Sequence, residues 1–301
     1  MLSYRHAFHA GNHADILKHT ALVCCLDYMT KKDVPLLYVD SHAGAGAYQL
    51  DTGYASQNRE WEEGYARLLS YANGSPERRV SAPLSYTPSA AVPEALRAYL
   101  EAIAAFRARP GAESSYPGSP ALALSRLRAH DRAVFFELHP SDCALLLKLC
   151  SEEPRARVRR EDGFSGLKAV LPPASKRALC LVDPSYELAS DYEGAQRALR
   201  EALKRFATGS FLLWYPLLER AEAKAFPALL RSEAEAAGRP WLDARLWLRV
   251  NAPGERGMAG SGIIAVNPPF ALVTALGECL PYLAAALSPA TGGWSLDTSS
   301  A

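Results

Sequence analysis

The chain has 301 residues, 49% of them hydrophobic, so it can bury a large core in one or two domains. Its 33 Lys and Arg nearly balance 32 Asp and Glu, and the net charge of +1 excludes a basic field over the whole surface. There is no signal-peptide pattern, no run of about 20 apolar residues and no CxxC pair among six cysteines. We therefore expect a cytoplasmic protein with reduced thiols, no metal site and no membrane contact.

The first predicted elements are a capped helix and a buried strand. Asn12 is a suitable N-cap for a helix that buries Ile16 and Leu17, and Asp15 lies in its favourable first turn. The apolar run 36–40 then predicts a strand that ends in the small-residue turn 42–46.

Residues 50–115 differ from the rest of the chain. Two segments, around Trp61–Leu69 and Leu96–Phe106, have the apolar spacing of amphipathic helices, and a Ser/Pro-rich connector from Ser75 to Pro93 separates them. We interpret this block as an inserted helical subdomain. The main domain then comprises residues 1–49 and 116–301.

From residue 120 onward, strands and helices alternate regularly. Predicted strands lie at 134–138, around 158, and at 179–183, 211–215, 246–250 and 263–266. Predicted helices lie at 120–129, 141–152, 163–170, 192–207, 218–236 and 272–286. This alternation predicts an α/β fold with a doubly wound, mostly parallel sheet of seven strands. The last strand should be antiparallel, because the loop before it is too short for a crossover helix.

Three consecutive strand ends carry residues that suit a nucleoside cofactor. After the first strand, Asp40 leads into a turn in which Gly44 and Gly46 let a ligand approach the backbone. Glu137 could accept hydrogen bonds from both hydroxyls of a ribose, and Asp162-Gly163 is placed to meet an adenine ring. The turn lacks the third glycine of a GxGxxG dinucleotide loop.

The fourth strand ends in Asp183-Pro184-Ser185-Tyr186. The Asp183 carboxylate and the following backbone carbonyl could each accept one N–H of an adenine amine, which would free its lone pair to attack a methyl sulfonium. Pro184 fixes the backbone between the two acceptors, and Tyr186 offers a face on which the extruded base can stack. Asn267-Pro268-Pro269 also fits this pattern, but it follows the antiparallel strand and should lie at the opposite edge of the sheet.

Long motifs of the sequence resemble a known family. They include 4–15, 40–46, 116–120, 137–142, 162–164, 205–209, 214–216 and 267–269, so that the likeness spans nearly the whole chain. These segments resemble the RlmJ-type enzymes, which are adenine-N6 methyltransferases of large-subunit ribosomal RNA. The resemblance implies a Rossmann-like class I methyltransferase fold and S-adenosylmethionine as cofactor.

The resemblance also implies roles for individual residues. Asp183 would be the catalytic acceptor, and Tyr4 would lie near the RNA. The residues that would line the cofactor pocket are His19, His42, Ser119, Glu137, Asp162 and Gly163. The family has Asp-Pro-Pro-Tyr at the catalytic position, whereas this chain has Ser185 in place of the second proline.

The leading hypothesis is therefore methylation of an adenine in 23S ribosomal RNA, either free or early in assembly, by a monomer. The alternatives are a DNA adenine-N6 methyltransferase and a nucleic-acid-binding protein that keeps the fold without turnover. Because the net charge is so small, RNA recognition should depend on a local patch, for which we expect Tyr4, Arg5 and Lys18.

Overall fold

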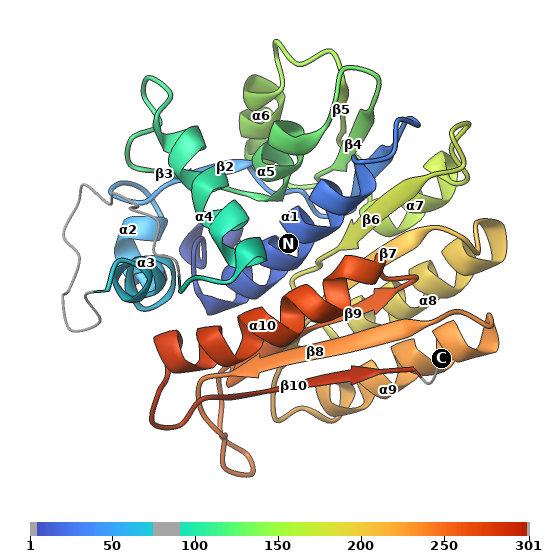
Figure 1. Cartoon of the computed structure of the whole chain (residues 1–301). Helices are drawn as coiled ribbons and strands as arrows, with labels where there is room; N and C mark the ends of the chain where they lie inside the picture. Colours follow the sequence, from blue (N-terminus) through green and yellow to red (C-terminus); the bar gives the residue numbers. More distant parts are fainter. Residues whose placement is uncertain (1–4, 75–90, 300–301) are drawn as a thin grey trace.

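In a computed structural model, which describes residues 5–74 and 91–299, the chain folds around one large sheet with helices on both faces (Figure 1). The eight strands of this sheet lie in the order β10-β8-β9-β7-β6-β1-β4-β5. Their bounds are β1 Leu37–Asp40, β4 Arg132–Phe136, β5 Ala156–Arg159, β6 Ala178–Val182, β7 Ser210–Leu217, β8 Trp241–Trp247, β9 Gly260–Val266 and β10 Gly293–Thr298.

The centre of the sheet is parallel and apolar on both sides. β1 lies between β4 and β6, and Val39 is in register with both Val134 and Cys180. Along β6, Leu179 and Leu181 face one hydrophobic cluster while Cys180 faces the other. Strands buried on both faces need such continuous apolar runs, and this is why the central strands could be predicted from the sequence.

Two helical layers cover the sheet (Figure 1). One hydrophobic cluster packs α1 and α10 against one face of the sheet. The other cluster packs α8 and α9 against the opposite face. The helix bounds are α1 His13–Met29, α5 Ser119–Arg126, α6 Pro140–Leu149, α7 Gly163–Val170, α8 Ala189–Arg205, α9 Ala221–Ala236 and α10 Phe270–Leu287. Asn12 caps α1 as predicted, because its side chain accepts from the backbone amides of Ala14 and Asp15.

The antiparallel end of the sheet differs from the prediction in two details. β9 is antiparallel to β7, as expected, but the count of seven strands is wrong because β10 adds an edge strand after the last helix. β8 begins at Trp241 and not near Leu246. The start of β8 is hidden in the sequence, because the charged residue Asp243 interrupts its apolar pattern. In the structure this carboxylate is fully buried and pairs with Arg231 and Arg245.

By length and composition, α10 could cross a membrane, with a mean hydropathy of 1.7 over 18 residues. In the structure it packs against α1, β8 and β10. This packing is that of a core helix.

A small two-stranded sheet brackets the predicted insertion. β2 (Ala47–Gln49) pairs antiparallel with β3 (Ser115–Pro117). Between them lie α2 (Ala55–Asn58), a π-helical turn at Glu62–Ala66, α3 (Arg67–Ala72) and α4 (Glu94–Arg107). Most of the predicted connector falls outside the described residues, and the domain division remains a prediction.

Candidate functional site

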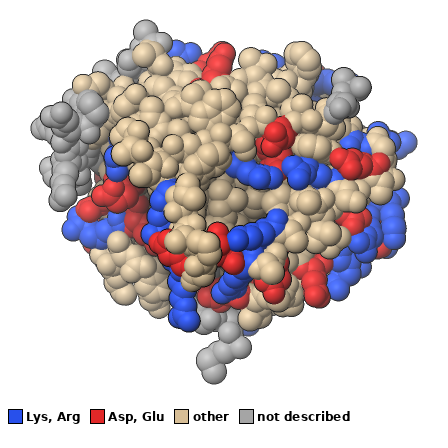
Figure 2. Space-filling view, turned by 90° about the horizontal axis from the view of Figure 1, so that it is seen from below, with Lys and Arg blue, Asp and Glu red and all other residues tan. Residues whose placement is uncertain are grey.

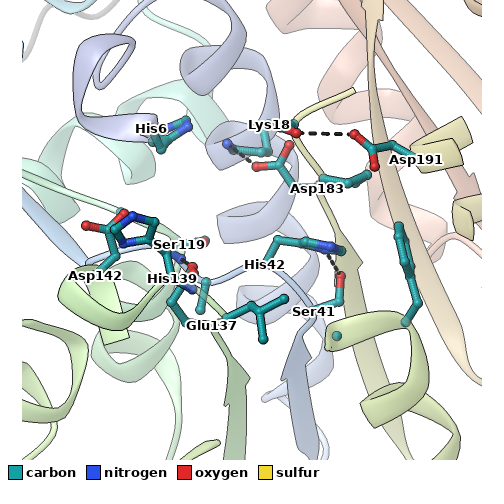
Figure 3. Close-up of a pocket in the computed structure, with 18 of the residues that line it drawn as sticks. His6, Lys18, Ser41, His42, Ser119, Glu137, His139, Asp142, Asp183 and Asp191 are labelled. Atoms are coloured by element: carbon teal, nitrogen blue, oxygen red, sulfur yellow. Dashed lines mark hydrogen bonds and ion pairs between the residues drawn. The ribbon is translucent and has the colours of Figure 1, made fainter. Parts of the chain in front are cut away.

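The carboxyl ends of the parallel strands meet at one pocket of about 220 Å³. Glu137 follows β4, Asp162 follows β5 and Asp183 follows β6, and all three line the pocket. Figure 3 shows Glu137 and Asp183 on opposite sides of it. The residues predicted to bind the cofactor line the same pocket: His19, His42, Gly44, Ser119, Glu137, Asp162 and Gly163. Residues as far apart in the sequence as His19 and Asp183 therefore form a single site.

Two backbone amides hold the Glu137 carboxylate in place. Oε2 accepts from the amide of Gly44 at 2.8 Å, and Oε1 accepts from the amide of His139 at 2.6 Å. Gly44 has a φ of +61°, and a Cβ there would lie 2.2 Å from the Tyr48 hydroxyl, so this turn requires glycine. Burial raises the pKa of Glu137. Each carboxylate oxygen keeps a second acceptor site for a ligand hydroxyl.

Asp162 and Gly163 form the start of α7. The Asp162 side chain accepts from the amide of Ser165 at 2.9 Å. Burial works against ionisation here, but this hydrogen bond lowers the pKa of Asp162 below its ordinary value. A Cβ on Gly163 would lie 1.7 Å from the carbonyl oxygen of Ser41, so only glycine lets α7 begin against the loop after β1.

Asp40 lies fully buried behind the pocket wall. It accepts from the Ser119 hydroxyl at 2.6 Å and from the Tyr38 hydroxyl at 3.0 Å. Burial raises the pKa of Asp40 to about 6. The predicted pocket residue Ser119 is thus held by a carboxylate from the first strand.

Both predicted histidines are uncharged at neutral pH. Burial lowers the pKa of His19 to about 3, and its Nδ1 lies 3.0 Å from the Tyr116 hydroxyl. Burial also lowers the pKa of His42, whose Nδ1 lies 2.7 Å from the Ser41 hydroxyl and whose ring packs edge-on against Phe164. Neither histidine brings a positive charge to the pocket.

Lys18 contacts the catalytic candidate directly. Its Nζ lies 2.6 Å from Oδ2 of Asp183 and 2.8 Å from Oδ1 of Asp15. Burial alone would lower the pKa of Lys18, but the two carboxylates raise it well above its usual range. The predicted role of Lys18 in a surface RNA patch is wrong, because the side chain is buried between these two acids.

The loop predicted to be catalytic also differs from expectation at Tyr186. Its ring packs among Tyr192, Trp214 and Phe226, and its hydroxyl donates to the carbonyl of Trp214 at 2.7 Å. With 2% of its surface exposed, Tyr186 presents no stacking face in this structure, which corrects that prediction. Pro184 and Ser185 do line the pocket.

The N-terminal RNA patch is not found as predicted. Arg5 pairs with Asp142 at 3.2 Å, and its guanidinium lies over the Tyr54 ring. Its charge is therefore balanced by a neighbouring acid, while its side chain stays partly exposed. Tyr4 lies outside the described residues.

Several charged or titratable residues at the site were not predicted from the sequence. His6, Asp142 and Asp191 line the pocket (Figure 3). Behind them, Asp15 holds both Lys18 and the ring of His6. The spacing of Asp15 and Lys18, three residues apart on a helix, was a usable signal. Asp142 follows the end of β4 by six residues, so its place near the strand ends was also within reach, whereas nothing in the sequence pairs His6 with them.

The competing Asn-Pro-Pro motif lies away from this pocket, as expected from the direction of β9. The Asn267 side chain donates to the carbonyls of Ala207 and Gly209, which fixes the turn between β9 and α10. Among the described residues, no group of three His, Cys, Asp or Glu side chains is arranged to hold a metal ion.

Comparisons with known proteins agree over nearly the whole chain. A family model described as "Ribosomal RNA large subunit methyltransferase D, RlmJ" matches residues 33–80 and 86–299. The chain is 41% identical over 294 residues to "Ribosomal RNA large subunit methyltransferase J" of Escherichia coli (strain K12), covering 97% of this chain and 96% of that one. It is 38% identical over 300 residues to the protein of the same name from Haemophilus influenzae, covering 99% and 98%.

A solved structure gives the same result for the fold. A crystal structure of a protein from Legionella pneumophila superposes with a TM-score of 0.82 at 31% sequence identity. The superposition covers 97% of this chain and 99% of that chain.

Proposed function

Because the chain belongs to the family described as ribosomal RNA large subunit methyltransferase D, RlmJ, we propose that it methylates the N6 amine of an adenine in 23S ribosomal RNA. The methyl donor in this proposal is S-adenosylmethionine. We propose further that it acts as a monomer in the cytoplasm, on RNA that is free or early in assembly. One observation carries the proposal. Asp183 and Pro184 lie in the same pocket as Glu137 and Asp162, so an acceptor for an amine adjoins residues suited to a nucleoside.

The pocket residues fit S-adenosylmethionine. Glu137 keeps an acceptor site on each oxygen for the two ribose hydroxyls, and Asp162 is available to the adenine amine. The missing Cβ atoms of Gly44 and Gly163 let Tyr48 and the Ser41 carbonyl pack closely, which fixes the wall of the pocket. When bound, this cofactor supplies a methyl group on a positively charged sulfur.

The protein's own part in the reaction is to hold the adenine amine. Lys18 occupies Oδ2 of Asp183, which leaves Oδ1 to accept one N–H of the amine. The Pro184 carbonyl would accept the other N–H, and Pro184 limits the directions that this carbonyl can take. Positive charge that develops on the amine during transfer then faces the Asp183 carboxylate.

Ser185, which stands where the family has a second proline, is also held in place. The Ser185 hydroxyl donates to Oδ2 of Asp191 at 3.2 Å, and Asp191 also accepts from the amide of Leu188. These bonds restrain the loop at the position where the family has a second proline. We prefer RNA to DNA as the substrate because the relatives at 38–41% identity are named as ribosomal RNA methyltransferases.

A pair of substitutions tests this assignment by opposite effects. Asp183→Asn should lower the rate of methyl transfer to RNA by about 10²–10³, with unchanged affinity for S-adenosylmethionine, because the carboxylate acts mainly in the transition state. Glu137→Gln should weaken cofactor binding about tenfold or more, because hydroxyl bonds to a charged acceptor are lost. Isothermal titration and labelled methyl transfer measure the two effects separately.

Asn267→Ala is the control, since this residue lies at the opposite edge of the sheet and should affect neither quantity. A wild-type rate for Asp183→Asn would remove Asp183 from the reaction. An unchanged dissociation constant for Glu137→Gln would remove Glu137 from the cofactor site.

A further inference from the structure

A second groove opens beside the pocket, between α7 and α8. Its volume is about 290 Å³, and it shares Asp162, Phe164 and Asp191 with the main pocket. Beyond these shared residues, it is lined by Ser165, Lys168, Ser190, Gly194, Arg197 and Ala198. The two cavities are therefore neighbours with a common wall.

The groove has acidic and basic ends. Asp162 and Asp191 form the shared wall, whereas Lys168 and Arg197 lie further along the two helices. Arg197 follows Asp191 by six residues on α8, which corresponds to about 9 Å of helix. Lys168 follows the start of α7 by five residues, or about 7.5 Å. Both cations therefore lie about one and a half helical turns from the common wall.

These cations are unpaired. Within residues 5–74 and 91–299, neither Lys168 nor Arg197 has a carboxylate oxygen within 4.0 Å, whereas Arg200 on the same helix pairs with Glu233. Arg197 is exposed, and Lys168 is half-buried. Two unpaired cations that face one groove favour an anionic ligand.

The proposed cofactor does not supply that anion. On the assignment above, Asp162 meets the adenine end of S-adenosylmethionine, and that end carries no phosphate or carboxylate. The second groove begins at this same residue. Its cations must therefore serve a different molecule that enters the site.

A nucleotide of the substrate has the matching polarity. Its backbone presents phosphate oxygens to the two cations, and its base edge presents N–H donors to Asp191, the acid of the shared wall that the cofactor does not use. Phe164 and Ala198 give the groove an apolar floor on which a sugar can rest, and Gly194 allows α8 to approach the Phe164 ring because a Cβ there would lie 2.7 Å from it.

We propose that the groove between α7 and α8 binds the RNA backbone next to the target adenine, with Lys168 and Arg197 contacting its phosphates. This inference rests on the proposed function and names how the same site holds its substrate. Lys168 and Arg197 are binding residues and take no part in methyl transfer.

The test is a double variant, Lys168→Gln with Arg197→Gln. The matched control is Lys148→Gln with Arg205→Gln, which removes the same charge from exposed cations of α6 and α8 that form no ion pair within the described residues. Protein-free large-subunit RNA is the probe, and its dissociation constant is measured over a range of salt concentrations. The groove variant should bind about tenfold more weakly or worse, and its salt slope should fall by about 1.4, or 0.7 for each phosphate contact. The control should behave as wild type, and both should bind S-adenosylmethionine normally.

A second measurement locates the contact. In short RNAs that contain the methylated adenine, single phosphates are replaced by uncharged methylphosphonate linkages. Wild type should bind more weakly when the linkages next to that adenine are uncharged. The groove variant should bind these RNAs and the unmodified RNA equally, because both changes remove the same interaction.

Three results would overturn the inference. The first is that the groove variant binds RNA as tightly as wild type. The second is that the control variant loses as much RNA affinity as the groove variant. The third is that the groove variant loses affinity for S-adenosylmethionine but not for RNA. The proposed function is judged separately by the wild-type protein. If the wild-type protein methylates no adenine in RNA, the proposed function is wrong. If the wild-type protein methylates RNA and the groove variant binds RNA equally well, only the role of the groove is wrong.

Discussion

At the residue scale, the site depends on buried charges whose partners lie far apart in the sequence. Asp40 is completely buried, receives hydrogen bonds from Ser119 and Tyr38, and lies near the Lys18–Asp183 pair. Strand-end reasoning could predict that Glu137 and Asp162 meet, because the ends of parallel strands converge at one edge. It could not predict that Lys18 points inward, since the direction of a helical lysine depends on the packing of its helix.

Asp40 should make the stability of the protein depend on pH. Burial raises the pKa of Asp40 from 3.8 to about 6. The folded state therefore holds this proton at pH values where the unfolded state has released it, and the free energy of unfolding falls as pH rises from about 4 to about 6. The loss contributed by Asp40 is about 3 kcal/mol.

Asp40→Asn removes that titration. Denaturant unfolding of both proteins between pH 4 and 6 should show the variant gaining stability relative to wild type as pH rises. A constant difference across this range would show that Asp40 does not titrate there.

At the element scale, the parallel half of the sheet is easier to predict than the antiparallel half. β1 and β6 are short apolar runs, whereas β8 carries Asp243 and Arg245 in its middle. β10 is an edge strand with few apolar residues, so its pattern resembles a loop. The turns before the helices matter more for the site, because they set how closely α7 approaches the loop after β1.

Gly163→Ala tests that close approach. The added Cβ would lie 1.7 Å from the carbonyl oxygen of Ser41, and this backbone contact cannot move without shifting β1 or α7. We expect the variant to lose several kcal/mol of stability and most of its cofactor affinity, because α7 and the pocket wall must separate.

The control is Gly277→Ala within α10, where the nearest atom to a new Cβ is Leu296 Cδ2 at 3.8 Å. This change should stabilise the protein by about 0.5–1 kcal/mol, because alanine favours a helix more than glycine does. Denaturant titration measures both variants. Equal stability of the two would contradict the packing seen at Gly163.

At the scale of the whole molecule, the described face in Figure 2 offers no broad basic field to a nucleic acid. Figure 2 shows Lys and Arg lying next to Asp and Glu in short alternating groups, as the net charge of +1 leads one to expect. Binding then has to come from a few contacts close to the pocket. Such a small footprint suits a loop or junction in RNA, where extruding a base costs less than in a duplex.

This footprint predicts a preference among substrates. Protein-free 23S ribosomal RNA should accept more methyl groups than the mature large subunit, in which proteins and RNA packing cover most loops. Labelled methyl transfer to equal amounts of each substrate measures the preference. Equal incorporation would mean that the target stays accessible after assembly.

The most direct test of the central claim is the chemical identity of the methylated nucleoside. Protein-free large-subunit RNA is incubated with the protein and S-adenosylmethionine labelled in its methyl group, then digested to nucleosides and analysed by mass spectrometry. An amine held between the Asp183 carboxylate and the Pro184 carbonyl should give labelled N6-methyladenosine and no other labelled nucleoside. Asp183→Asn, which still binds the cofactor, should give almost none. Label on a ring atom of adenine, on a ribose hydroxyl or on another base would contradict the account.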